Sequence, residues 1–450
     1  MSRPIKELAK GFKDRTWVTA KLAAKVGMSA ARRQIAGAKT DAPSDAQVHE
    51  SIEAAKKLVV ELGQLKGLVM KVGQMASYLP GALPAPAQEV LAELQAQSTR
   101  MDTDQVRAVL EAELGASVDE LFESFDPEPI AAASIGQVHR ARHRGRDVAV
   151  KIQYPGIEEV LKSDLSTFSV LTKVGTFGLP IDAAALAEEL RSRILEECDY
   201  RIEAASQRAL APLLEKVPGA SVPEVIEERS SQRVLTTELV DAMPFGEFAR
   251  TASQAAKDRA GEIIFRTCME TLFKHGVYNG DPHPGNYLFR PDGSVVFLDF
   301  GCVRRFEEDF IEKWKAFARS MIDGDRAVFP ERYRALGMVG TERGYDWDGQ
   351  YEVVSYLYRP LTQREPFMRF DDDYVRGSYA VLLFDNPNQR KTACPPEWLL
   401  LNRLQWGMYA VLAKLDARAA WPDFMRGAAL APFEGPVPPG KRPREVRAEA

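Results

Sequence analysis

Two short motifs carry the residue types that phosphoryl transfer needs. DPHPGN runs from Asp281 to Asn286, and DFG begins at Asp299. Phosphoryl transfer uses a carboxylate beside the attacking hydroxyl and oxygen ligands that hold Mg²⁺ against the phosphates. Asp281, Asn286 and Asp299 supply three such oxygens, and a pair of short strands is expected between the second and the third. We therefore predict that these three residues form a catalytic and metal-binding group.

The order D-x4-N followed by DFG is the spacing of protein-kinase catalytic loops. A DFG tripeptide alone is weakly informative because it arises often by chance, whereas the two motifs together are specific. The kinase pattern is incomplete, since Gly280 stands where the HRD arginine would be and no APE follows within thirty residues. Control by activation-loop phosphorylation and a peptide-docking groove are therefore not expected. His283 is expected to shape the turn between two prolines rather than to act as acid or base.

A lysine further upstream lies on a predicted strand. VAVKI (Val148–Ile152) places Lys151 where kinases hold the α- and β-phosphates. Before it, AAASIGQV aligns with the kinase glycine-rich loop, with alanine at two glycine positions. Backbone N–H groups of such a loop would still face phosphate, although each Cβ hinders close approach. The predicted loop contacts to nucleotide are Ala131, Ala132, Ala133, Ser134, Gly136 and Val138.

Lys151 needs an acidic partner, and LEECDYRIEA (195–204) offers several. Helical spacing places Glu196, Asp199 and Glu203 on one face, with Glu197 about 100° round the helix. We predict that one of these acids pairs with Lys151, and the spacing leaves open which one.

Composition limits the class of protein. The 450 residues are 45% apolar and 27% charged, which is typical of a soluble globular chain, and the net charge of −5 argues against nucleic-acid binding. The four cysteines form no CxxC pair and fit a reducing compartment. No uncharged apolar run reaches the length of about 18 residues that a membrane-spanning helix needs. We expect a cytoplasmic protein, placed peripherally on the inner face of a membrane.

The first forty residues hold ten basic and two acidic side chains with apolar residues at helical spacing. Such a segment fits an anionic membrane surface, and a solvated N-terminal arm fits it equally well.

Periodicity and composition divide the chain into five parts. We predict a basic arm and linker (1–47), a helical extension (48–120), an N-lobe (121–240), a helical C-lobe (241–430) and a disordered tail (431–450). The expected strands are Val148–Ile152, Arg233–Leu239, Tyr287–Phe289 and Val295–Leu298.

Together the motifs resemble the UbiB/AarF family of atypical protein-kinase-like proteins. The resemblance rests on KVGQ at 71–74, followed along the chain by PIAAASIGQVHRAR, VAVKIQYPG, EECDYRIEA, VLTTELV, DPHPGN and FLDFG. The chain resembles the branch that includes the mitochondrial ATPases that support coenzyme Q. Unlike the bacterial UbiB branch, this chain lacks a C-terminal pair of transmembrane helices.

The resemblance implies an α+β, two-lobed kinase-like fold with a small mixed β N-lobe, a helical C-lobe and an added helical N-terminal extension. It implies ATP and Mg²⁺ as cofactors and an ATPase or small-molecule or lipid kinase that supports ubiquinone biosynthesis. Isoprenoid or quinone lipids, a membrane surface and quinone-biosynthesis enzymes are the partners that it suggests.

The resemblance also assigns roles to single residues. Asp281 would accept the proton, and Asn286 and Asp299 would hold Mg²⁺. Lys151 would pair with Glu203. The implied cleft and hinge residues are Lys71 and Gln74 on the extension, Glu197 and Asp199 facing Lys71, and Glu238, Leu239 and Val240 at the adenine hinge.

Two other functions fit part of the pattern. An aminoglycoside-phosphotransferase-like enzyme would share GDPHPGN and LDFG but lack KVGQ and AAASIGQVH. A lipid-binding scaffold switched by nucleotide is the second alternative, and the complete set of Lys151, Asp281, Asn286 and Asp299 argues against a dead site.

Overall fold

The computed structural model describes residues 101–437, apart from 134, 160, 163–194, 280–281, 364–367, 384, 390 and 394. These residues form two compact units. The first takes in 101–200 and Glu227–Thr236, and the second takes in Arg201–Ile226 and 237–437.

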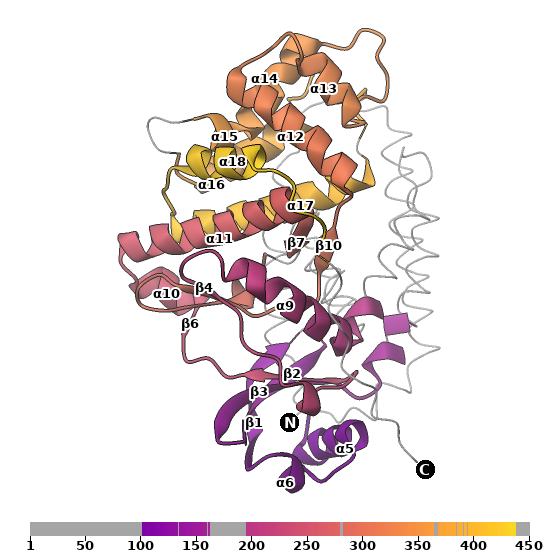
Figure 1. The fold of residues 1–450 in the computed structure, drawn as a ribbon, viewed down its shortest axis with the longest axis vertical. Helices are drawn as coiled ribbons and strands as arrows, with labels where there is room; N and C mark the ends of the chain where they lie inside the picture. The colour runs from indigo at the N-terminus through magenta and orange to yellow at the C-terminus, as the bar shows by residue number, and fades with distance from the viewer. Residues whose placement is uncertain are drawn as a thin grey trace, which may run out of the picture. The chain divides into compact units, whose positions relative to one another are not determined.

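The first unit is built on a four-stranded sheet with the order β1-β2-β3-β5 (Figure 1). The β1–β2 and β2–β3 pairs are antiparallel. The last two residues of β5 fall in the second unit. The elements are α5 (Thr103–Leu114), α6 (Val118–Leu121), β1 (Ser124–Ala133), β2 (Gly136–His143), β3 (Arg146–Gln153), the 3-10 helix η2 (Glu227–Arg229) and β5 (Val234–Glu238).

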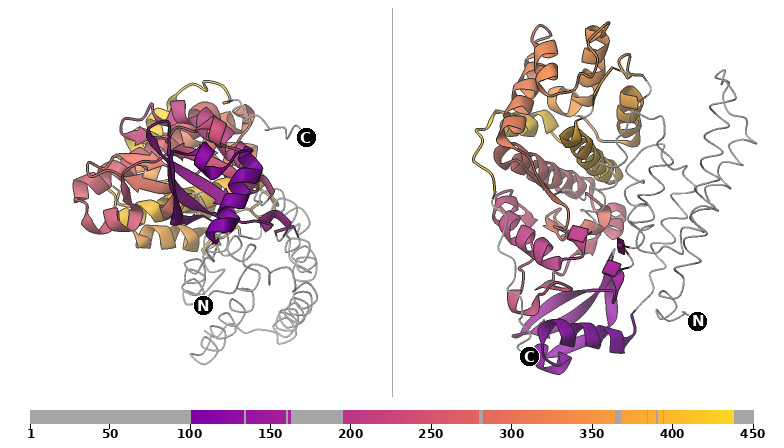
Figure 2. Two further views of the ribbon diagram at one scale, coloured as in Figure 1. Left: turned by 90° about the horizontal axis from the view of Figure 1, so that it is seen from below. Right: turned by 90° about the vertical axis from the view of Figure 1, so that its right-hand side faces the viewer.

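Alternation along β3 decides which face of this sheet is the core. Val148, Val150 and Ile152 are buried, whereas Ala149 and Lys151 between them are only partly buried. Helix α5 packs against β3, and α6 packs against β1 (Figure 2). The sheet therefore has one buried face, and the side chain of Lys151 stands on the other.

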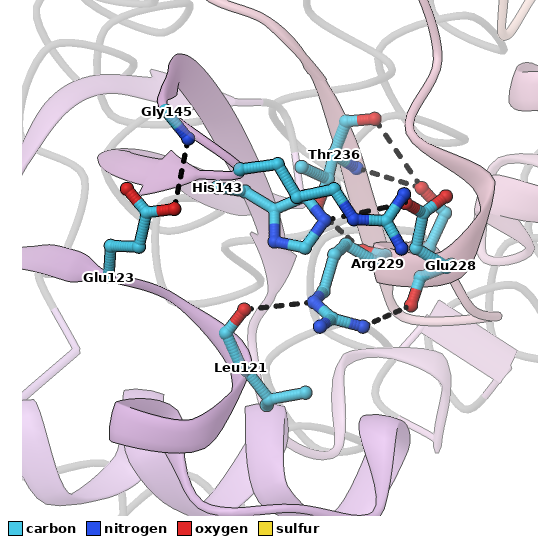
Figure 3. A network of polar contacts seen from close by, with 9 residues as sticks. Leu121, Glu123, His143, Gly145, Glu228, Arg229 and Thr236 are labelled. Atoms are coloured by element: carbon cyan, nitrogen blue, oxygen red, sulfur yellow. Dashed lines mark hydrogen bonds and ion pairs between the residues drawn. The ribbon is translucent and has the colours of Figure 1, made fainter.

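A polar network fixes the β2–β3 hairpin to η2 (Figure 3). Glu228 lies 2.8 Å from the guanidinium of Arg144 and 3.4 Å from Nε2 of His143. A backbone hydrogen bond, His143 and Arg144 lower the pKa of the Glu228 carboxyl. Arg229 donates from Nε to the carbonyl of Leu121 at 2.9 Å. The short η2 turn thus connects the hairpin to the end of α6.

The second unit is mostly helical, with two small sheets. One sheet has the order β4-β9-β8-β6, and the other pairs β7 with β10. The elements are α9 (Tyr200–Leu214), β4 (Ala220–Ser221), β6 (Met243–Pro244), α10 (Phe245–Thr251), α11 (Gln254–His275), β7 (Val277–Asn279), η3 (Pro284–Asn286), β8 (Tyr287–Phe289), β9 (Val295–Phe297), β10 (Val303–Arg305), α12 (Glu308–Asp323), α13 (Phe329–Ala335), α14 (Trp347–Leu357), α15 (Arg359–Thr362), α16 (Asp372–Leu383), α17 (Pro396–Leu415) and α18 (Trp421–Leu430).

Helix α11 is the centre of this unit. It contacts α17, α18 and β7, and Ile264, Phe265 and Phe273 on it are fully buried (Figure 1). Ser253 caps its N-terminus by accepting from the N–H of Ala256, and Gly276 ends it in the left-handed region. The helix is therefore followed directly by β7 and the DPHPGN segment.

The chain after α18 packs along the α11–β7 junction. Glu434 donates its N–H to the carbonyl of Lys274 at 2.7 Å, and Nδ1 of His275 lies 3.1 Å from the carbonyl of Gly435. Arg305 on β10 donates from Nε to the carbonyl of Val437 at 3.2 Å. The packed C-terminal segment therefore reaches Val437, six residues beyond residue 431, where the tail was expected to start.

The expected α+β architecture, with a small sheet-based unit and a helical one, is confirmed. The four expected strands appear as β3, β5, β8 and β9. Of the expected helical extension (48–120), residues 48–100 lie outside the described residues, and the remainder contains α5 and most of α6. Of the helices that the structure describes, none combines the length and apolar character that crossing a bilayer requires.

Candidate functional site

The Ala-rich segment forms the tip of the β1–β2 hairpin. Ala133 pairs with Gly136, and Ala131 pairs with Val138. Ala131 and Ala132 are exposed, and Ser134 lies outside the described residues. The pairing of β1 with β2 therefore continues to Ala133 and Gly136, and the exposed alanines stand at this end of the hairpin.

Gly136 is a glycine for a reason of packing. A Cβ added to it would lie 2.1 Å from the carbonyl oxygen of Ile152. Real side chains do not approach backbone oxygen so closely, so only glycine lets β2 and β3 pair at this point. Strand pairing alone therefore requires glycine at position 136, whether or not this residue also contacts nucleotide.

Three of the predicted nucleotide-binding residues stand in one row across the sheet. Ala131 is opposite Val138, and Val138 is opposite Lys151. Residues directly opposite in antiparallel strands point to the same face. Strand register thus brings Ala131, Val138 and Lys151 together on the face away from the α5 side of the sheet.

Lys151 contacts the segment that contains the candidate acids. Its Nζ lies 4.8 Å from the ring centroid of Tyr200, which is a cation–π distance. Gln153, two residues further along β3, donates from Nε2 to the carbonyl of Cys198 at 2.9 Å. Burial and the charges of Glu158 and Glu197 raise the pKa of the Cys198 thiol to about 12, so it stays protonated at neutral pH.

The acids near Tyr200 are placed differently from one another. Glu197 and Asp199 precede α9 and are partly buried. Glu203 lies on the first turn of α9 and is only 5% exposed. Lys71 and Gln74 lie outside the described residues, so their contacts with Glu197 and Asp199 stay predictions.

The β8–β9 hairpin brings the two predicted metal ligands to one end. Tyr287 is opposite Phe297, so Asn286 and Leu298 stand side by side just beyond the paired strands. The N–H of Leu298 donates to the carbonyl of Asn286 at 3.0 Å. Asp299 is the next residue, and it therefore follows Asn286 closely in space although thirteen residues separate them.

His283 shapes the turn between two prolines, as expected. Its Nδ1 accepts from the N–H of Gly285 at 3.0 Å, and its carbonyl accepts from the N–H of Asn286 at 2.9 Å. The short helix η3 begins directly after it. Asp281 itself lies outside the described residues.

A second carboxylate stands beside the DFG motif. Oδ1 of Asp299 accepts from the N–H of Gly301 at 2.9 Å. A Cβ added to Gly301 would lie 3.4 Å from that oxygen and 3.7 Å from Oε2 of Glu203. Asp299 and Glu203 therefore flank the same glycine.

One backbone donor of the predicted adenine hinge is already used in a hydrogen bond within the protein. The N–H of Glu238 donates to the carbonyl of Glu224 at 2.9 Å, so this donor is already used. A hinge contact to adenine would have to use other backbone groups between Glu238 and Val240.

Amide and carboxylate oxygens of Asn286 and Asp299 are hard ligands that suit Mg²⁺. Among the described residues, no three His, Cys, Asp or Glu side chains converge as a metal site. The arrangement fits a metal that takes few protein ligands and completes its coordination with phosphate and water.

Sequence reasoning missed three residues that lie against the predicted site segments. Gln153 donates to the carbonyl of Cys198, Asn279 donates to the carbonyl of Asp299, and Gly407 lies close to Pro282. A buried glutamine at the end of an apolar strand was a usable signal for Gln153. For Gly407 there was none, because its close contact is with Pro282, far away in the sequence.

Comparison with known proteins adds the following. The model of the ABC1 atypical kinase-like domain matches residues 93–331. The chain is 31% identical over 415 residues to the mitochondrial atypical kinase COQ8 of Saccharomyces cerevisiae. This match covers 88% of this chain and 80% of the yeast protein.

The mitochondrial atypical kinase coq-8 of Caenorhabditis elegans is 32% identical over 372 residues. The match covers 81% of this chain but 49% of the nematode protein, so the chain spans about half the length of that relative. Among solved structures, the complex of Rv3197 from Mycobacterium tuberculosis with erythromycin is similar, with a TM-score of 0.63 and 29% identity, and covers 87% of this chain and 100% of that one.

Proposed function

Because the chain belongs to the ABC1 atypical kinase-like family, we propose that it binds Mg²⁺-ATP and transfers or hydrolyses the γ-phosphoryl group in support of isoprenoid quinone biosynthesis. The match to the ABC1 family model confirms the family that the motifs predicted. The observation that supports the activity most directly is the placement of Asn286 and Asp299 at one end of the β8–β9 hairpin.

Each residue has a distinct part in this proposal. Lys151, held beside Tyr200, is the cation for the α- and β-phosphates. The exposed hairpin tip at Ala131 and Ala132 covers the phosphates, and the stretch from Glu238 to Val240 contacts adenine. Asn286 and Asp299 hold Mg²⁺, which when bound neutralises phosphate charge.

The proposed reaction moves the γ-phosphoryl group of ATP to an acceptor oxygen. An acceptor oxygen, from a hydroxyl or from water, forms a bond to the γ-phosphorus while the bond to the β–γ bridging oxygen breaks, and that oxygen leaves with ADP. Asp281 takes the proton from the acceptor oxygen. Glu203, buried beside Gly301, is the proposed partner of Lys151.

Binding and turnover of ATP test the site. Asp299→Asn is expected to weaken Mg²⁺-ATP binding because it removes a formal charge facing a divalent ion. Asp281→Asn is expected to keep binding and lose turnover, because it removes only the base. Asp309→Asn, at an exposed acid on α12, is the control. Calorimetry in which both site variants bind and turn over Mg²⁺-ATP like the control would overturn the assignment.

Quinone profiles test the biological role. Deletion of the gene is expected to lower isoprenoid quinones measured by mass spectrometry, and wild type but not Asp281→Asn is expected to restore them. Unchanged quinones after deletion would reject this role while leaving the ATP site standing.

A small-molecule kinase is the second candidate. The similar Rv3197 structure is a complex with erythromycin, which supports a site for a bulky small molecule in proteins of this fold. If ATP turnover rises with a macrolide or an aminoglycoside and a phosphorylated product is detected, this candidate replaces the quinone role.

A peripheral place on a membrane is part of the same proposal. The ten basic residues among the first forty would contact anionic lipid, each adding about 1 kcal/mol at low salt. Pelleting with anionic liposomes is expected to fall with salt and with removal of residues 1–40. Equal pelleting of the shortened chain would contradict it.

A further inference from the structure

Asn279 occupies the point where the two segments of the catalytic site meet. It is the last residue of β7, two positions before Asp281, and it is paired with Val303 at the start of β10. Strand β7 leads into the catalytic loop, and β10 follows the DFG motif. A contact from this side chain therefore links the segment before the base to the segment that holds the metal ligand.

The side chain makes that contact with one of its two polar groups. Nδ2 of Asn279 donates to the backbone carbonyl of Asp299 at 2.7 Å. Since a carbonyl oxygen can only accept, this bond fixes which end of the amide faces Asp299. The other end, Oδ1, is buried and accepts no hydrogen bond from any described residue.

A buried amide oxygen without a donor is unfavourable for stability. An apolar side chain of the same shape would avoid that cost, yet it could not donate to Asp299. The arrangement therefore favours the contact with Asp299 over the best packing at this position.

We infer that Asn279 is a positioning residue that sets the peptide of Asp299, and through it the direction of the metal-binding carboxylate. This rests on the proposed Mg²⁺-ATP site. Asp299 already directs Oδ1 back to the N–H of Gly301, so its carboxylate is held from one side by that bond and its backbone from the other by Asn279. Without the amide donor, the Asp299 peptide can rotate and the carboxylate loses its fixed direction.

The test measures how nucleotide binding depends on Mg²⁺. In the full chain, Asn279→Ala is expected to raise the Mg²⁺ concentration needed for half-maximal binding of a fluorescent ATP analogue about two- to tenfold, the range that one hydrogen bond supplies. Binding of the same analogue in EDTA is expected to stay at the wild-type level, because Asn279 has no part in holding the nucleotide.

Two further variants separate positioning from stability. Asn279→His is expected to restore the wild-type Mg²⁺ midpoint, since its Nδ1 is as many bonds from Cα as the amide nitrogen and can donate to the same carbonyl. Asn279→Leu keeps the shape without any donor, folds without the unpaired oxygen, and is expected to shift the midpoint as alanine does.

Asn388 provides a matched control. It is fully buried in the same unit and donates from Nδ2 to the backbone carbonyl of Asp346, also at 2.7 Å. Asn388→Ala is expected to lower the melting temperature without moving the Mg²⁺ midpoint. If Asn279→Leu and Asn388→Ala both keep the wild-type midpoint, the inference is wrong. If wild type itself shows no Mg²⁺-dependent binding, the proposed function fails first.

Discussion

The β1–β3 part of the first sheet and the proposed catalytic loop around Pro282 are held by contacts of opposite kinds, local in the first and distant in the second. In β1–β3 the decisive neighbours are close in sequence: Gly136 fits against Ile152, sixteen residues later. The catalytic loop depends on distant partners. The hydroxyl of Tyr278 donates to the carbonyl of Leu404 at 3.3 Å across 126 positions, and Gly407 on the same helix leaves room for Pro282.

This difference explains why the first region is more readable in the sequence. Pairing between neighbouring strands produces a visible sequence pattern, namely alternating apolar and polar residues and a glycine at a fixed position. The packing of α17 against the proposed catalytic loop produces no pattern in the sequence near that loop. A substitution in the hairpin should therefore act on local folding, and one in the support of the loop should act on the chemistry.

Gly136→Ala should produce the largest loss of stability. The added Cβ would meet the Ile152 carbonyl at 2.1 Å, so β2 must move away from β3, at about 3 kcal/mol of unfolding free energy. Gly145→Asn, in the turn of the same strand pair, is the control because nothing lies within 4 Å of its Cβ and asparagine tolerates its φ of +73°. We expect it to cost no more than about 1 kcal/mol. Equal urea-unfolding curves for the two variants would contradict the packing argument.

Gly407→Ala tests the distant support of the catalytic loop. Its Cβ would lie 2.4 Å from Cγ of Pro282, so the loop must shift, and we expect lower ATP turnover with a loss of about 1 to 2 kcal/mol. Gly427→Ala, in α18 with open space around it, should instead stabilise the chain by roughly 0.5 to 1 kcal/mol through helix propensity. Turnover unchanged in both variants would mean that α17 does not position the loop.

The contrast between Gly136 and Gly407 also shows which parts of the fold and site could be predicted from the sequence and which could not. Lys151, Asn286 and Asp299 can be predicted because kinase-like spacing is local, and the strands that carry or adjoin them are short runs of β-branched or aromatic residues. The first strand of the sheet was missed because Pro127 and Pro129 lie within it, which only an edge strand tolerates. Asn279 and Gly407 act through residues that the fold alone brings near.

The C-terminal segment is a second distant support, and Phe433→Ala tests it. Phe433 packs near Gly276 and lies 5.6 Å from the buried ammonium of Lys315, which also donates to the carbonyl of Ala431. We expect a loss of roughly 1 to 2 kcal/mol and faster proteolysis after α18. Leu430→Ala, at a side chain that is 54% exposed, should change neither. Proteolysis at the same rate in the two variants would show that the C-terminal segment does not stabilise this part of the second unit.

The smallest expected effect is a pH dependence within the first unit. His139 is fully buried, its ring stacks on Phe125 at 5.1 Å, and its Nδ1 lies 2.9 Å from the carbonyl of Asp126. Nδ1 therefore carries the proton, and Nε2 accepts from the amide of Gln137 at 2.7 Å. Burial lowers the pKa of His139, although the Asp126 carbonyl and the charges of Asp126 and Glu128 oppose it.

The sign of the effect follows from that lowered pKa. Near and below pH 6.5 the unfolded chain binds a proton at His139 that the folded chain does not, so stability is complete above this pH and falls as the pH decreases. One such proton gives a slope of at most about 1.4 kcal/mol per pH unit. His139→Phe keeps the stacking on Phe125 and removes the titration, so its free energy of unfolding should be lower at pH 7 but change less between pH 7 and 5. Hydrogen exchange at β2 and β3 measures this locally, and equal slopes for the variant and wild type would show that other groups set the acid response.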